Sequence, residues 1–222
     1  MTTFQTATRH VLACVALVAA PIMTSAAPLA SQQAAAALRA TPDVQHGESL
    51  FQVCIACHAS DAGGTANGDV PAIAGQYRSV IVRQLLDFHY GKRWDVRMEA
   101  IAKSHYLSAA QDLADVAAYV SNMPRISNPG RGDGHQAAHG MTVYQRLCAS
   151  CHGALAQGNA RQSIPWLAGQ HYEYLLREMY YTFDHRRPNL APHLSLLDQF
   201  ERPEFEGVAD YLSGLVPPGG GH

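Results

Sequence analysis

Two pentapeptides of the form Cys-x-x-Cys-His are the residues of this chain best suited to do chemistry. They begin at Cys54 and at Cys148, 94 residues apart. Two thiols three positions apart on a helical turn can reach the two vinyl groups of one porphyrin, and the adjoining imidazole then lies under the ring, toward the iron. Each pentapeptide therefore predicts one covalently attached c-type haem. The predicted attachment points are Cys54, Cys57, Cys148 and Cys151, and the predicted iron ligands are His58 and His152.

Three other chemistries of a Cys-x-x-Cys pair fit these motifs less well. A zinc site would need the two pairs brought together, which neither the His after each pair nor the long separation requires. A thioredoxin-like dithiol is expected at a strand-to-helix turn, and no strand pattern flanks either pair. A structural disulfide within each pair would leave the two following histidines unexplained. Haem attachment is the interpretation that uses all of these residues.

The N-terminus carries the pattern of an export signal. Ten mostly polar residues precede the apolar run Val11–Ala20, and a stretch of small residues follows up to Ala27. These are the three regions of a secretory signal peptide. We expect residues 1–27 to be removed, together with Cys14, and the mature chain to be periplasmic. The apolar run is too short to span a bilayer, so we expect no transmembrane segment in the mature chain.

The charge of the chain favours proteins as partners. Its 222 residues include 16 basic and 18 acidic ones, and the formal net charge is −2. A nucleic acid or an anionic membrane surface would require a basic patch, and here the two signs are mixed along the chain. We therefore expect redox proteins as partners, with no more than transient docking to membrane complexes.

The sequence on either side of the two pentapeptides is repeated as well. Ahead of each pentapeptide a Gly stands four residues before an aromatic residue, and after it comes a Pro followed shortly by Ala-Gly-Gln. These elements are Gly47 with Phe51 and Pro71–Gln76 in the first copy, and Gly140 with Tyr144 and Pro165–Gln170 in the second. In one departure, Phe51 precedes its first Cys by three positions and Tyr144 by four. The repeat predicts two domains rather than one.

Helices are the elements that must position these motifs. Apolar side chains recur at helical spacing from 77 to 88 and from 172 to 183, so each stretch predicts an amphipathic helix with one face in a core. A last helix is expected from a cap-like Ser108 in the first copy and from Pro203 in the second. The predicted organisation is a flexible N-terminal segment at 28–42, domains at 43–123 and 135–216, a linker at 124–134 and a flexible tail at 217–222.

The order of these motifs resembles tandem class I cytochrome c domains, as in the dihaem cytochrome c4-like family. The resemblance covers roughly residues 43 to 216. It implies an all-α fold in which each domain wraps round one covalent haem c, so that the chain carries two. It also implies that the first and last helices cross near Gly47 and Tyr119, and near Gly140 and Tyr211. The carbonyls of Pro71 and Pro165 would accept hydrogen bonds from the outer nitrogens of His58 and His152.

The second iron ligand of haem 1 follows from the same resemblance. Class I domains take it from a Met in the loop before the last helix, and Met98 stands there, 40 residues after His58. Met98 is therefore the predicted ligand. The alternative is a core methionine, because Met is a common gap-filler. Met123 lies past the last helix and is a poorer candidate.

The second copy breaks this pattern. No Met follows Met179, which lies in the amphipathic helix and is more plausibly part of the core. His193 stands at the matching distance, 41 residues after His152, and imidazole is a good iron ligand. His193 is therefore the predicted ligand of haem 2. The alternatives are an open iron, or ligation by His185 or Met179.

These features predict a periplasmic carrier of single electrons between a dehydrogenase or quinol-oxidising complex and a terminal oxidase or reductase. No Gly-rich phosphate loop or paired carboxylates compete with this reading. The alternative is a haem enzyme, or the haem subunit of a dehydrogenase, in which haem 2 binds a small oxyanion or a peroxide. His193 would then be displaceable, and Arg186 and Arg187 beside it could attract the anion.

Overall fold

The computed structural model describes residue 1 and residues 29–127 and 129–216, and nearly all of its regular structure is helical. The only strand-like pairing in these ranges is one isolated bridge between Asn159 and Ile164. Apart from residue 1, the predicted signal peptide lies outside the described residues, and so does the predicted tail at 217–222. No helix in the described ranges is long and apolar enough to cross a membrane.

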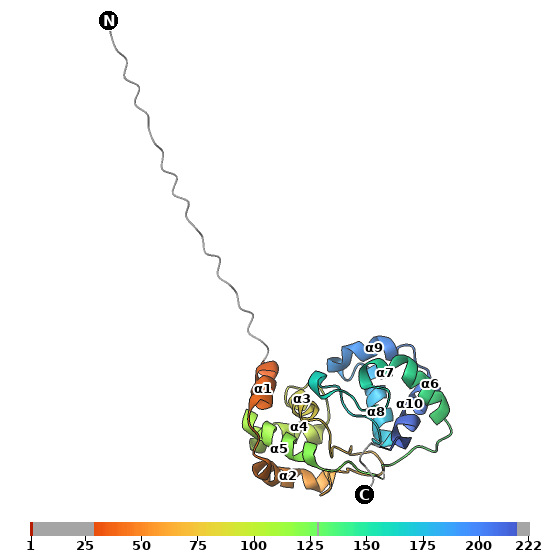
Figure 1. The fold of residues 1–222 in the computed structure, drawn as a ribbon, viewed down its shortest axis with the longest axis horizontal. Helices are drawn as coiled ribbons and strands as arrows, with labels where there is room; N and C mark the ends of the chain where they lie inside the picture. The colour runs from red at the N-terminus through yellow and green to blue at the C-terminus, as the bar shows by residue number, and fades with distance from the viewer. Residues whose placement is uncertain (2–28, 128, 217–222) are drawn as a thin grey trace.

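The helices form two groups that lie side by side (Figure 1). The first group contains α1 (Leu29–Arg39), α2 (Val44–His58), α3 (Arg78–His89), α4 (Val96–Ala102), the 3₁₀ turn η1 (His105–Leu107) and α5 (Ala110–Asn122). The second contains α6 (Ala137–Leu147), α7 (Ala149–His152), η2 (Ala160–Gln162), α8 (Tyr172–Phe183), η3 (Pro188–Leu190), α9 (Ala191–Leu197) and α10 (Arg202–Gly214). The prediction of an all-α fold in two repeated domains is confirmed.

The first and last helices of each domain cross at a glycine, as expected. A Cβ atom on Gly47 would lie 2.1 Å from the carbonyl oxygen of Asp115, so α2 and α5 can approach this closely only without a side chain there. A Cβ atom on Gly140 would lie 1.7 Å from the carbonyl oxygen of Gly207, which fixes the crossing of α6 and α10 in the same way. Beside each crossing the aromatic rings meet with centroids 5.5 Å apart, as the pairs Phe51–Tyr119 and Tyr144–Tyr211.

The extra residue between Tyr144 and Cys148 has a local structural effect. In the first domain α2 runs without a break from Val44 through His58. In the second domain α6 ends at Leu147, and Cys148 takes φ −110° and ψ −34° before α7 begins. The insertion is therefore absorbed as a break in the helix, and both Cys-x-x-Cys-His motifs still end on a helical histidine.

Helix α1 lies in the segment for which the sequence predicts a flexible chain, and that prediction is wrong. The segment is rich in alanine, the best helix former, and Ala37 is fully buried. The guanidinium of Arg78, at the start of α3, donates to the carbonyl oxygens of Ala37 at 2.6 Å and Ala40 at 2.9 Å. These bonds satisfy carbonyls at the end of α1 and hold it on the first domain.

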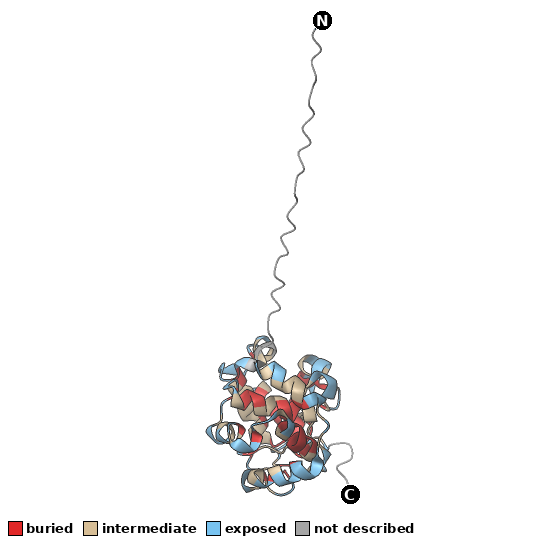
Figure 2. Ribbon diagram, turned by 90° about the vertical axis from the view of Figure 1, so that its left-hand side faces the viewer, coloured by how far each residue is buried: buried red, intermediate tan, exposed pale blue. Residues whose placement is uncertain are grey.

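Each domain has its own apolar core. Figure 2 shows the buried residues on the inner faces of the helices and the exposed residues on the outside. The last helix of the first domain does not begin at Ser108 as expected. It begins at Ala110, and the side chain of Asp112 accepts the backbone N–H of Ala109. In the second domain the last helix carries Pro203 in its first turn, as predicted.

Candidate haem sites

His58 is the last residue of α2, and its imidazole is buried with one ring nitrogen in a hydrogen bond. Its Nδ1 atom lies 3.1 Å from the carbonyl oxygen of Pro71, to which the N–H form donates. Only 5% of the residue is exposed, and burial lowers its pKa. A neutral ring whose Nδ1 carries the proton leaves Nε2 as a lone-pair donor to a metal, and the carbonyl fixes the ring orientation.

His152 is held in the same way at the end of α7. Its Nδ1 atom lies 3.4 Å from the carbonyl oxygen of Pro165, and the residue is 8% exposed. Burial and then the nearby His193 lower the pKa of His152 to about 4. The two domains therefore present equivalent neutral imidazoles, each fixed by a proline carbonyl 13 residues further along the chain.

No disulfide joins the four cysteines of the motifs in the described part of the chain. Cys54 and Cys148 are partly buried, and burial raises the pKa of each thiol to about 11, with a smaller contribution from its partner cysteine. A redox-active dithiol depends on a lowered thiol pKa. Cys57 and Cys151 are exposed, and the two pairs lie in different domains. The geometry thus fits neither a disulfide, nor a thioredoxin-like dithiol, nor one shared zinc site.

Met98 is the third residue of α4, a short helix rather than the loop that the sequence predicts. Asp95 caps this helix by accepting the backbone N–H groups of Arg97 and Met98. The charges of Arg97 and Asp95 both act on the pKa of His58, so the start of α4 lies near the buried imidazole. Met98 is the residue that follows Arg97 in the first turn of this helix.

His193 occupies the corresponding place in the second domain, as the third residue of α9. Its ring centroid lies 5.9 Å from that of His152. Two imidazoles on opposite sides of one metal ion, each with a metal–nitrogen distance of about 2 Å, would have centroids about 6 Å apart. Burial, followed by the charge of Arg187, lowers the pKa of His193 and favours the neutral ring that a metal requires. The pair fits a haem iron held between them.

The other candidate ligands lie elsewhere. Met123 packs against the core of the first domain and Met179 against that of the second, as expected for Met179. His185 is exposed in a turn with φ +58°. Arg187 is buried and paired with Glu178, and Arg186 lies over the rings of Trp94 and Tyr181. The two arginines are therefore already engaged by protein groups, which does not support the expected anion site.

Sequence reasoning missed the contacts that join the two domains. The Gln76 amide donates to the carbonyl oxygen of Trp166 and accepts its backbone N–H, both at 3.0 Å. The Gln170 amide does the same with Ala72, donating at 2.7 Å and accepting at 3.0 Å. Gln76 and Gln170 are 94 positions apart, and so are their partners Ala72 and Trp166. This is also the interval between the two Cys-x-x-Cys-His motifs. The domains therefore meet through the same surface, about a local pseudo-twofold axis.

A second reciprocal pair involves the loops just after the haem-attachment motifs. The Tyr77 hydroxyl donates to the carbonyl oxygen of Gln157 at 2.7 Å, and His171 Nε2 lies 2.7 Å from the carbonyl oxygen of Gly63. Nδ1 of the same buried histidine accepts the N–H of Gly130 in the linker at 2.7 Å. The Ala-Gly-Gln repeat was the available signal, but a repeat alone does not show which residues face the other copy.

A helical domain that buries one carbonyl-oriented histidine beside a Cys-x-x-Cys pair, present twice, defines a cytochrome c with two haem domains. The family model for cytochrome c matches residues 44–124 and 137–214. Cytochrome c4 of Pseudomonas aeruginosa is 26% identical over 187 residues, which cover 79% of this chain and 90% of that protein. Cytochrome c4 of Thiocapsa roseopersicina is 31% identical over 193 residues, 78% of this chain and 93% of that protein.

The fold comparison agrees. The crystal structure of reduced recombinant cytochrome c4 from Pseudomonas stutzeri matches with a TM-score of 0.69 and 24% identity, covering 79% of this chain and all of that one. The chain belongs to the cytochrome c4 family. It accordingly carries two covalent c-type haems, one at Cys54 and Cys57 and one at Cys148 and Cys151, and it transfers electrons.

Proposed function

We propose that this protein is a periplasmic electron carrier whose two haems would be held by different pairs of iron ligands. Haem 1 is held by His58 and Met98, and haem 2 by His152 and His193. The observation that carries this proposal is the 5.9 Å separation of the His152 and His193 rings. The matching positions of Met98 and His193, each third in its short helix, support the same assignment.

When bound, the haems supply one-electron redox chemistry, and the chain sets how readily each is reduced. The Met98 thioether favours ferrous iron, whereas the His193 imidazole favours ferric iron. Haem 2 therefore has the lower potential. A difference of about 59 mV is tenfold in a one-electron equilibrium, so a modest gap places the first electron on the His58 side. A dehydrogenase or quinol-oxidising complex then reduces the carrier, and a terminal oxidase or reductase oxidises it.

The proposed location follows from the export signal pattern of residues 1–27. The competing role is a haem enzyme, or the haem subunit of a dehydrogenase, with a displaceable His193. It is less favoured because Arg187 and Arg186 make other contacts, Arg187 with Glu178 and Arg186 with aromatic rings. A carrier needs a six-coordinate iron that exogenous ligands do not enter, whereas an enzyme needs a vacant or exchangeable position.

Ligation is tested by electron paramagnetic resonance of the ferric holoprotein. We expect one His/Met and one His/His low-spin signal, and His193→Ala should convert only the second to a high-spin species. His185→Ala, which removes an exposed histidine eight residues away, is the matched control and should change neither signal. Met98→Ala should alter only the first signal, with Met123→Ala as its control. Unchanged signals in His193→Ala would refute the assignment, and rapid cyanide binding to wild-type haem 2 would favour the enzyme.

A further inference from the structure

Each motif histidine is bonded to a peptide group that the other domain also bonds. In the first domain, His58 Nδ1 lies 3.1 Å from the carbonyl oxygen of Pro71. The N–H of the same peptide group belongs to Ala72, and it donates to Oε1 of Gln170, a residue of the second domain, at 3.0 Å. One planar peptide group therefore stands between a histidine of one domain and a glutamine of the other.

The second domain repeats this arrangement in the opposite direction. His152 Nδ1 lies 3.4 Å from the carbonyl oxygen of Pro165, and the N–H of Trp166 donates to Oε1 of Gln76, a residue of the first domain, at 3.0 Å. Each domain thus supplies the glutamine that bonds the peptide group behind the other domain's histidine. We call these two paths the crossed hydrogen-bond chains. They are Gln170–Ala72–Pro71–His58 and Gln76–Trp166–Pro165–His152.

A second bond to the same residue holds each glutamine in place. Gln170 Nε2 donates to the carbonyl oxygen of Ala72 at 2.7 Å, and Gln76 Nε2 donates to that of Trp166 at 3.0 Å. Because a carbonyl can only accept, these bonds fix the orientation of each amide, with Oε1 toward the peptide N–H. Gln170 is also buried, and hydrogen bonds away from water polarise one another more strongly.

A peptide group transmits polarisation from its N–H to its carbonyl oxygen. The two are coupled by resonance across the C–N bond, and bonds in such a chain strengthen one another by about 10–30% each. An acceptor on the N–H of Ala72 therefore makes the carbonyl of Pro71 a better acceptor for His58. A stronger bond at Nδ1 raises the electron density of the ring and its basicity toward a metal.

We infer that Gln170 and Gln76 are positioning residues for the iron ligands of the opposite domain, and that docking of the domains lowers the potential of each haem through the crossed hydrogen-bond chains. An electron-rich imidazole stabilises ferric iron more than ferrous iron, because ferric iron has the higher charge. The inference goes beyond the carrier role but rests on the proposed ligation by His58 and His152. It does not depend on Met98 or His193.

The competing explanation is that the glutamines only hold the domains together. A loosened interface would admit water to both haems, and water favours the more highly charged ferric form. Loosening therefore lowers both potentials, whichever glutamine is changed. Loss of one crossed chain instead raises one potential, that of the haem in the other domain. The two explanations differ both in the sign of the shift and in its location.

The test uses Gln170→Met and, separately, Gln76→Met, which keep the size of the side chain and remove its hydrogen bonds. Each holoprotein is titrated potentiometrically, and each haem is followed by its own NMR signals. Losing an outer partner of a metal-bound histidine typically costs about 10–100-fold in affinity or activity. Here the proline carbonyl remains and only its polarisation is lost, so we expect a smaller shift toward ferrous iron, about threefold or about 28 mV. Gln170→Met should shift haem 1, and Gln76→Met should shift haem 2.

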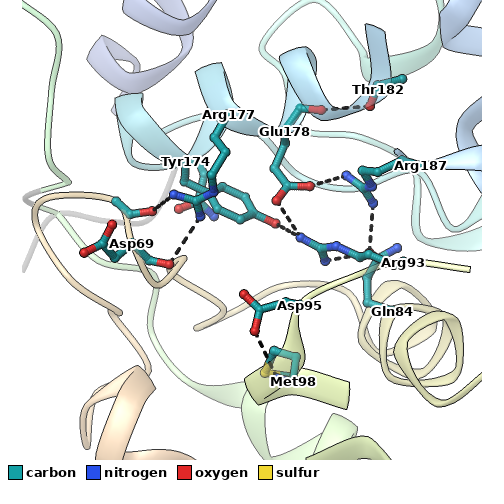
Figure 3. Close-up of polar contacts among 12 residues, drawn as sticks. Asp69, Gln84, Arg93, Asp95, Met98, Tyr174, Arg177, Glu178, Thr182 and Arg187 are labelled. Carbon is teal, nitrogen blue, oxygen red and sulfur yellow. Dashed lines mark hydrogen bonds and ion pairs between the residues drawn. The ribbon is translucent and has the colours of Figure 1, made fainter. Parts of the chain in front are cut away.

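Gln84→Met is the matched control. Gln84 also bonds across the interface, where its Oε1 accepts from Arg187 at 3.2 Å as well as from Arg93 of its own domain at 2.8 Å (Figure 3). These bonds involve neither proline peptide group, so the same substitution removes an interdomain contact and leaves both crossed chains intact. We expect both reduction equilibria to stay within about 1.5-fold of the wild type, or about 10 mV.

The NMR spectrum of the reduced holoprotein provides a second measurement, because low-spin ferrous haems are diamagnetic. In Gln170→Met the Nδ1 proton of His58 should move upfield, as a weaker hydrogen bond requires, and that of His152 should stay in place. Gln76→Met should show the reverse.

Two results would overturn the inference. One is a pair of potentials within about 1.5-fold of the wild type in both glutamine variants, and the other is a fall of both potentials in either variant. Each variant decides the matter alone if the other fails to fold, since the two predictions concern different haems. The low-spin paramagnetic signals of each protein test the ligands separately. Unmoved potentials with unaltered signals would refute the crossed chains and leave the ligand assignment standing.

Discussion

The substitution Gln170→Ala should weaken the docking of the two domains by about 2–4 kcal/mol. The side chain is 9% exposed and makes three bonds, accepting the N–H groups of Ala72 and His171 and donating to the carbonyl oxygen of Ala72. Its removal leaves three backbone groups without these partners. Each buried unsatisfied group costs about 1–3 kcal/mol. Ala72 is only half-buried, so water recovers part of that loss, and the sum falls in the stated range.

Guanidinium unfolding of the holoprotein measures this cost. Circular dichroism reports the helices. In a Trp94→Phe background, which removes the other tryptophan, fluorescence reports Trp166 at the interface, where its backbone N–H donates to Gln76 and its ring lies under Arg125. We expect the fluorescence transition to move to lower denaturant than the helical one, because the domains separate before they unfold. Gln76→Ala, which removes the symmetry-related pair of bonds, should behave alike. In the control Gln52→Ala only one exposed bond is lost, and its effect should stay within about 0.5 kcal/mol. A Gln170→Ala protein no less stable than this control would refute the reasoning.

Three further outcomes are expected. Gly140→Ala should destabilise the second domain by about 2–4 kcal/mol in thermal unfolding, because the new methyl group would overlap a backbone carbonyl, whereas Gly214→Ala, with no atom within 4 Å, should be neutral. The hydrogen bond to Asp115 raises the pKa of His46, so its contribution to stability is present below about pH 6.5 and is lost as pH rises through the folded pKa. His46→Ala should therefore lose stability relative to wild type at pH 6 and little at pH 8. Arg78→Ala should speed amide hydrogen exchange in α1 and leave exchange in α10 unchanged. Exchange in α1 as slow in the variant as in the wild type would contradict the docking of α1 through Arg78.

Much of the fold follows from short-range rules. The crossing of the end helices was expected from the resemblance to class I cytochrome c domains, and the structure gives its physical reason. Only glycine permits the backbone contact at Gly47 and Gly140, and an aromatic residue one turn later packs beside each crossing. The Cys-x-x-Cys-His spacing carries its own chemistry, so the attachment sites needed no tertiary information. Met98 and His193 were predicted as ligands partly from their distance along the chain from His58 and His152. Each is the third residue of a short helix.

Other features depend on contacts that the sequence does not display. Helix α1 buries little more than one face of alanines, and its docking depends on a guanidinium from a distant helix. The glutamines of the repeat seemed to mark only the start of a helix, since nothing in one copy shows that Gln76 and Gln170 bind the other. Arg187 suggested a ligand for anions until its burial against Glu178 was known.

The central claim is that Met98 and His193 give the two haems different reduction potentials. The most direct test is a potentiometric titration of the wild-type holoprotein in which each haem is followed by its own paramagnetic signal. The account predicts two one-electron waves, with the lower potential on the haem attached to Cys148 and Cys151. The substitution His193→Met should raise that wave toward the other, because it gives both haems a thioether ligand. Two equal potentials in the wild type, or a higher potential on haem 2, would contradict the account.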